Sequence, residues 1–89
     1  MYAITFVADS ADFVGMENGG DKATRIAFGK NLKRIRESKG MSQETLGLNA
    51  GSFQSTVLRI EHGDSNPKLI TIVALAKALG VEPKELLDF

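Results

Sequence analysis

The chain has no cysteine, no tryptophan and only two prolines among its 89 residues. Without cysteine it can form neither a disulfide nor a thiolate zinc site. Its single histidine cannot supply the several ligands that a histidine-based metal centre needs. The apolar residues Tyr2 to Ala8 lack a basic flank, and Asp9 and Asp12 follow them closely, which argues against a signal peptide and against a membrane span. We therefore expect a cytoplasmic protein without a membrane partner or a bound metal.

The charges balance overall but are unevenly distributed. Eleven basic and eleven acidic residues give a formal net charge of zero, which argues mildly against a nucleic-acid partner. Residues 21–40, however, contain seven basic and two acidic residues, a local excess of five positive charges. This basic strip fits either an anionic partner or the solvated face of an amphipathic helix, and charge alone does not decide between them.

The motifs of common enzymes are missing. The sequence has no nucleophile elbow, no pair of metal-binding histidines and no phosphate-binding glycine loop. The glycine-containing stretch 19–22 is expected to be a linker. We therefore predict a protein that is not an enzyme and that needs no cofactor, metal or small-molecule ligand.

The N-terminal residues differ in pattern from the rest of the chain. Tyr2, Ile4 and Phe6 recur with a period of two, which predicts a short strand, but no partner strand is visible downstream. Such a strand could pair with the same segment of a second subunit; disorder and docking on the core remain open alternatives. Three glycines within residues 15–21 predict a flexible joint. We accordingly divide the chain into an extension, 1–21, and a domain, 22–89.

The domain is predicted to be all α, with five helices. Phe28, Leu32 and Ile35 recur at helical spacing and predict a first helix that ends at Gly40.

Two short helical patterns separated by a glycine turn come next. Ser42 is a natural N-cap for a second helix, which Gly51 ends. Ser52 is the expected N-cap of a third helix over about 53–62, which Gly63 ends. A helix, a glycine turn and a second helix form the layout of a helix-turn-helix, whose second helix can lie in the major groove of DNA.

The C-terminal third predicts two more helices. The apolar run Leu69 to Leu79 is expected to be core, and Glu82-Pro83 opens a last short helix with proline at its first position. Leu86, Leu87 and Phe89 either complete the core or face a partner subunit.

The order of these residues resembles the Cro/repressor-like helix-turn-helix domains, the Xre family, over about residues 28–87. The resemblance rests on Leu32, Arg36, Gly40-Met41-Ser42-Gln43-Glu44, Leu46, Ala50-Gly51, Val57, Arg59-Ile60-Glu61, Gly63, Asn66-Pro67, Leu75-Ala76, Leu79-Gly80-Val81 and Glu85-Leu86. It implies a five-helix, lambda-repressor-like domain that binds double-stranded operator DNA, usually as a homodimer.

The resemblance also implies functional positions. Those that read bases in the family are Phe53, Gln54, Ser55 and Arg59. Gln54 is suited to adenine, Arg59 to guanine and Phe53 to thymine methyl groups.

For other positions the resemblance implies contacts to the DNA backbone or a structural role. Those near the phosphates are Ser42, Gln43, His62 and Ser65. His62 also fits a plain helix-end residue near the C-terminal dipole. Arg36 and Glu61 resemble an ion pair that ties the first helix to the end of the third.

Three departures from the family keep a second hypothesis open. Phe53 stands where a small polar residue is common, Leu58 where a polar one is frequent, and Asp64 where a basic one is usual. The first hypothesis is a sequence-specific transcriptional regulator, a repressor or controller protein, that binds a two-fold operator as a homodimer with helix 53–62 in the major groove. The alternative is a protein-interaction module, such as an antitoxin or a regulator-binding protein, that retains the fold.

Overall fold

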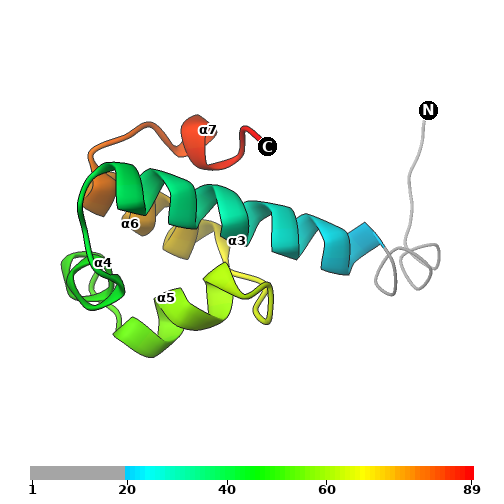
Figure 1. The fold of residues 1–89 in the computed structure, drawn as a ribbon, viewed down its shortest axis with the longest axis horizontal. Helices are drawn as coiled ribbons and strands as arrows, with labels where there is room; N and C mark the ends of the chain where they lie inside the picture. Colours follow the sequence, from blue (N-terminus) through cyan, green and yellow to red (C-terminus); the bar gives the residue numbers. More distant parts are fainter. Residues whose placement is uncertain (1–19) are drawn as a thin grey trace.

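The computed structural model describes residues 20–89, so the predicted N-terminal strand and its exchange between subunits lie outside the described residues (Figure 1). The described part of the chain is all α, as predicted. Its five helices are α3 (Gly20–Ser38), α4 (Gln43–Asn49), α5 (Gln54–Glu61), α6 (Leu69–Leu79) and α7 (Pro83–Leu86). None of these helices has the length and apolarity that a membrane crossing requires.

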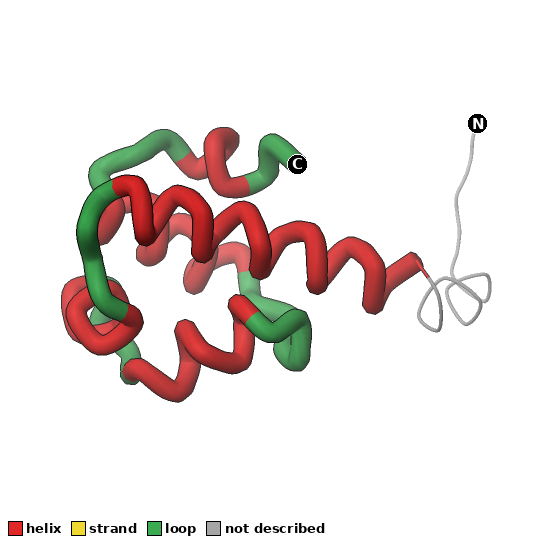
Figure 2. Tube along the Cα trace, viewed as in Figure 1, coloured by secondary structure: helices red, strands yellow, loops and turns green. Residues whose placement is uncertain are grey.

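The long helix α3 runs the length of the domain, and the shorter helices gather around it (Figures 1 and 2). It contacts α5 on one side and α7 on the other, while α4 contacts both α5 and α6. The helices α5 and α7 therefore lie on opposite sides of α3 (Figure 1).

Each of the five helices contributes to one apolar core. The largest fully buried side chains are Leu32, Leu46, Val57, Ile60, Leu75 and Leu86. The predicted stripe of the first helix is confirmed, because Phe28, Leu32 and Ile35 are all buried. The helical spacing of apolar residues thus identified most of the core.

The predicted ends of several helices are also confirmed. Ser42 is the N-cap of α4, and its Oγ accepts a hydrogen bond from the backbone N–H of Thr45 at 3.0 Å. Pro83 opens α7 at its first position. Gly80 follows α6 with a φ of 73°, in the left-handed region that a side chain disfavours.

The prediction that Ser52 caps the third helix is wrong. The N-cap of α5 is Phe53, with extended φ and ψ of −139° and 160°, and its side chain makes no capping hydrogen bond. Ser52 instead belongs to the turn, because its N–H donates to the carbonyl oxygen of Gly47 at 2.8 Å. Consequently α5 spans Gln54–Glu61, one residue shorter at each end than predicted.

The prediction that the whole run Leu69 to Leu79 is core is wrong at its start. Lys68 is the N-cap of α6, so Leu69 and Ile70 lie in its first turn, where they are 73% and 77% exposed. Ile72 is partly buried, and complete burial begins at Leu75. The apolar run is continuous in the sequence, but only the later turns of α6 are covered by other parts of the domain.

Two further features were not predicted. The first helix begins at Gly20, so Gly20 and Asp21, expected in a linker, are helical. The buried side chain of Asn31 donates from Nδ2 to the carbonyl oxygens of Glu85 and Leu86, each at 2.9 Å. This amide satisfies carbonyls at the end of α7 and holds that short helix on α3.

Candidate nucleic-acid interface

The turn between α4 and α5 is closed by contact with Gly47. A Cβ atom on Gly47 would lie 2.5 Å from the carbonyl carbon of Phe53, so no larger residue fits without moving the turn. The role of Gly47 was not predicted. A glycine inside a helix lowers stability by roughly 1 kcal/mol relative to alanine. Its presence there therefore indicates that another part of the chain packs closely against it. Gly47 therefore sets how closely the start of α5 approaches α4.

A second glycine brings the other end of α5 against α3. A Cβ atom on Gly29 would collide with the carbonyl oxygen of Ile60, in the last turn of α5. This glycine was also missed from the sequence, because the contact joins residues 31 positions apart. The two close approaches, at Gly47 and Gly29, fix both ends of α5 against the rest of the domain.

Arg36 and Glu61 form a buried ion pair between α3 and α5. Arg36 Nε lies 2.6 Å from Glu61 Oε2, and the two side chains are only 9% and 2% exposed. Arg36 also donates from Nη2 to Glu61 Oε1 at 3.1 Å and from Nη1 to the carbonyl oxygen of Met41 at 2.7 Å. The hydrogen bond to Glu61 raises the pKa of Arg36, although burial acts in the opposite direction, so the guanidinium stays charged.

The same carboxylate binds a residue that was expected on a DNA phosphate. Gln43, at the first position of α4, donates from Nε2 to Glu61 Oε1 at 2.9 Å. One hydrogen of that amide is therefore used inside the domain, and the second is not used by any described residue. Glu61 thus joins α3, α4 and α5 at one point.

The predicted base-reading side chains gather on the exposed face of α5. Gln54, Ser55 and Arg59 are exposed, and none of their side chains makes a hydrogen bond or ion pair with a residue of the described range 20–89. Positions 54, 55 and 59 lie on one helical face, with 55 and 59 one turn apart. Phe53 and Leu58 accompany them and are 70% and 37% exposed.

The predicted phosphate-contacting residues flank this face in different ways. His62 is the exposed C-cap of α5, and Ser65 is half-buried in the loop that follows. The Ser42 hydroxyl donates to Thr45 Oγ1 at 2.9 Å in addition to its capping bond, so its hydrogen is already in use.

The basic strip of α3 is not a uniform anion-binding surface. Arg25 pairs with Asp21 at 2.6 Å, and Arg34 donates to Asn31 Oδ1 at 2.8 Å. With the buried Arg36, three of the seven basic side chains make internal contacts. The four lysines of the strip are exposed, and they fit a solvated face and an anionic partner equally well.

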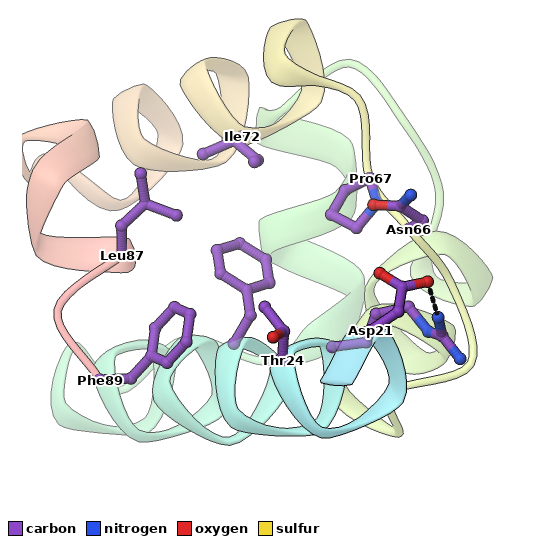
Figure 3. A pocket seen from close by; sticks show the side chains of 9 residues that line it. Asp21, Thr24, Asn66, Pro67, Ile72, Leu87 and Phe89 are labelled. Atoms are coloured by element: carbon purple, nitrogen blue, oxygen red, sulfur yellow. Dashed lines mark hydrogen bonds and ion pairs between the residues drawn. The ribbon is translucent and has the colours of Figure 1, made fainter. Parts of the chain in front are cut away.

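A small cavity lies away from α5, between the first turns of α3, the loop at Asn66-Pro67, α6 and the C-terminal residues (Figure 3). Its volume is about 120 Å³, and Phe28, Ile72 and Phe89 line it. Pockets for small molecules usually exceed about 300 Å³. Among the described residues, no group of three or more histidine and carboxylate side chains is placed to hold a metal. A more open hollow of about 410 Å³ lies between α3 and the C-terminal residues, so volume alone does not select a site. The exposed face of α5 is the candidate site because its unpaired polar side chains gather there.

Known proteins share this arrangement. The helix-turn-helix family model matches residues 32–86. The control protein C.BamHI of Bacillus amyloliquefaciens is 44% identical over 66 residues, which are 73% of this chain and 82% of that protein. The phage CTXphi transcriptional repressor RstR of Vibrio cholerae is 33% identical over 61 residues, 68% of this chain and 55% of the repressor.

A solved structure agrees in fold as well as in sequence. The restriction-modification controller protein C.AhdI from Aeromonas hydrophila superposes with a TM-score of 0.72 at 43% identity, covering 73% of this chain and 94% of the other. The helices, the turn and the sequence matches lead to the same conclusion: this chain belongs to the Xre-type, Cro/repressor-like helix-turn-helix family.

Proposed function

We propose that this chain is a sequence-specific DNA-binding transcriptional regulator of the cytoplasm, and that it reads its operator with the exposed face of α5. One observation carries the proposal. Gln54, Ser55 and Arg59 are exposed and unpaired on a helix that is held at both ends by close contacts and by a buried ion pair. Hydrogen-bonding groups held in this way are available for base edges without rearrangement of the domain.

The residue types suit direct reading of the major groove. Gln54 can pair with N6 and N7 of adenine, and Arg59 with O6 and N7 of guanine. We assign Gln43, His62 and Ser65 to the phosphates on either side, where such contacts would set the register of α5. Ser42 can join them only if its hydroxyl leaves Thr45.

The proposed regulator acts as a homodimer on a two-fold operator. Leu69 and Ile70 form an exposed apolar turn at the start of α6, one loop after α5. We assign this turn to a second copy of the chain, because it exposes two large apolar side chains one loop after the proposed DNA-reading helix. Changing both residues to serine should convert the dimer to a monomer in sedimentation. Leu48→Ser, at a similarly exposed leucine of α4, should remain dimeric.

Selection of bound duplexes from a random DNA pool tests the proposal. We expect a palindromic site with half-sites about one helical turn apart, roughly 10 base pairs from centre to centre. The relatives include a control protein and a transcriptional repressor, which supports a regulatory role.

The second candidate function is a protein-interaction module, favoured by the exposed apolar side chains of Phe53 and Leu58. An absence of any enriched DNA sequence would favour this module over the regulator.

A further inference from the structure

The small cavity beside the first turns of α3 offers an apolar lining to an occupant (Figure 3). Phe28 and Phe89 line it, with their ring centroids 6.2 Å apart in an edge-to-face arrangement. Leu87 and Phe89, at the same cavity, are still 51% and 55% exposed. Its two charged residues, Asp21 and Arg25, pair with each other at 2.6 Å. The cavity therefore suits an apolar group rather than an ion.

The more open hollow between α3 and the C-terminal residues adds positive charge to this surface. Phe89 lines both the cavity and the hollow, so the two adjoin. Lys30 and Arg34, one helical turn apart, bring two positive charges to the hollow, and Asp88 brings one negative charge. The Lys30 side chain has no hydrogen bond or ion pair within the described range 20–89. An occupant of both should thus combine an apolar group with an acidic one.

The N-terminal segment, residues 1–19, has this composition. It contains three acidic residues and no basic one, whereas residues 20–89 hold all eleven basic residues of the chain. The domain therefore has an excess of three positive charges and the N-terminal segment an excess of three negative charges. Phe13 and Val14 directly follow Asp12. The segment offers an apolar pair beside a carboxylate, which complements an apolar cavity beside a basic hollow.

The length of the chain permits this contact. The N-terminal segment joins the domain at Gly20, next to Asp21 of the cavity. Phe13 stands seven residues before Gly20, and an extended chain advances about 3.3 Å per residue, so Phe13 can reach roughly 23 Å from that point. A helix rises about 1.5 Å per residue, which places Phe28 about 12 Å along α3 from Gly20. So short a connection also favours the segment of the same chain over that of a second copy.

We propose that the N-terminal segment docks on α3 of its own domain, with the Phe13 ring in the cavity and Asp12 beside Lys30 of the hollow. A cavity of about 150 Å³ can hold benzene, and this one, of about 120 Å³, is open on one side, so it admits a phenyl ring. The docked segment covers apolar side chains that the described domain leaves exposed. This inference goes beyond the proposed function, because the surface contains none of the residues assigned to DNA.

Paramagnetic broadening in nuclear magnetic resonance spectra tests this inference on the full chain, which has no cysteine of its own. Ser10→Cys supplies a single thiol for a nitroxide spin label, and the amide signals of the isotope-labelled protein report which residues lie near it. We expect broadening at Lys30, Leu87 and Phe89 but none in α4, at the far end of α3 (Figure 1). Broadening confined to the first turn of α3 overturns the proposal.

Phe13→Ser is the matched variant, and Phe6→Ser, the same change seven residues earlier, is its control. Because the ring no longer enters the cavity, Phe13→Ser should reduce the ratio of docked to undocked segment by about tenfold or more. The broadening at Leu87 and Phe89 should then disappear, whereas Phe6→Ser should keep it. Broadening that persists in Phe13→Ser overturns the cavity contact.

A charge exchange tests the contact at the hollow. Asp12→Lys should weaken docking by about two- to fivefold, because it replaces an attraction to Lys30 by a repulsion. Adding Lys30→Glu to the same protein should restore the broadening. Failure of the second change to restore it overturns the pairing of these two residues.

A mixing experiment distinguishes the same chain from a second copy. Spin-labelled protein without isotope is mixed with isotope-labelled protein that carries no spin label. We expect no broadening at Leu87 and Phe89 in the mixture. If broadening appears there, the surface binds the segment of a second copy and the proposal is wrong. None of these measurements uses DNA, so failure of this inference leaves the proposed function untouched.

Discussion

The two ion pairs of α3 allow a direct test of what burial contributes to this fold. Arg36–Glu61 and Arg25–Asp21 both have a shortest nitrogen–oxygen distance of 2.6 Å. Their side chains are 9% and 2% exposed in the first pair but 24% and 37% exposed in the second. We expect Glu61→Ala to destabilise the domain far more than Asp21→Ala, although each variant removes one carboxylate from an arginine at the same distance.

The expected magnitudes follow from the surroundings of each carboxylate. Glu61→Ala leaves the charged Arg36 buried and removes the acceptor of Gln43, and such losses cost about 3–5 kcal/mol. Asp21→Ala breaks a pair one helical turn apart near the surface, which costs about 0.3–0.5 kcal/mol. A domain of this size is stable by roughly 5–10 kcal/mol, so the first variant should lose a large part of its stability.

Urea unfolding followed by circular dichroism measures both values. The double variant Arg36→Met with Glu61→Leu is a useful third measurement, because apolar residues in place of both charges should cost less than Glu61→Ala alone. Equal losses for Glu61→Ala and Asp21→Ala, or a loss below about 1 kcal/mol for Glu61→Ala, would refute the reasoning that burial makes this pair structural.

Three other predictions concern local contacts. Phe53→Ser should be more stable than Phe53→Ala by about 1 kcal/mol in urea unfolding, because both lose the ring but only serine can cap α5; equal stability would show that the site cannot be capped. Gly47→Ala should lower the unfolding free energy by about 1–3 kcal/mol, because its Cβ would press on the turn at Phe53; an unchanged value would mean that the turn yields freely. Asn31→Ala should cost about 1–3 kcal/mol and increase hydrogen exchange in α7, since two carbonyls lose their donor; unchanged exchange in α7 would contradict that role.

Much of the fold was predictable because the residues that begin and end a helix interact with residues only a few positions away. Ser42 caps α4 and Pro83 opens α7 through interactions within a few residues. Ser52 failed as a predicted cap because the turn closes on Gly47, and that closure moves the start of α5 by one residue. Whether a serine caps a helix thus depends on where the preceding turn ends, which local sequence does not show.

Burial and distant contacts were less accessible to sequence reasoning. Leu69 and Ile70 share the apolar character of the buried part of α6, and the sequence does not reveal where the covering helices end. The bond from Asn31 to Leu86 spans 55 residues and involves a backbone carbonyl, which carries no sequence signal. The close approach at Gly29 likewise depends on a helix far along the chain.

For the candidate site, the sequence predicted the exposed residues better than their internal partners. The side chains of Gln54, Ser55 and Arg59 are exposed together on α5, where the family resemblance placed them. The bond from Gln43 to Glu61 was not foreseen, because a glutamine at a helix start fits an internal carboxylate and a phosphate equally well.

The most direct test of the central claim, that the exposed face of α5 reads base sequence, is the specificity of Arg59→Ala. Affinity for the selected duplex and for duplexes with single base changes is measured by anisotropy, with Lys84→Ala on the opposite side of α3 as the control. We predict that Arg59→Ala loses about 1–3 kcal/mol of discrimination at one guanine per half-site, while Lys84→Ala keeps the full specificity. If Arg59→Ala and Gln54→Ala both leave affinity and base preference unchanged, the claim that α5 reads the operator is contradicted.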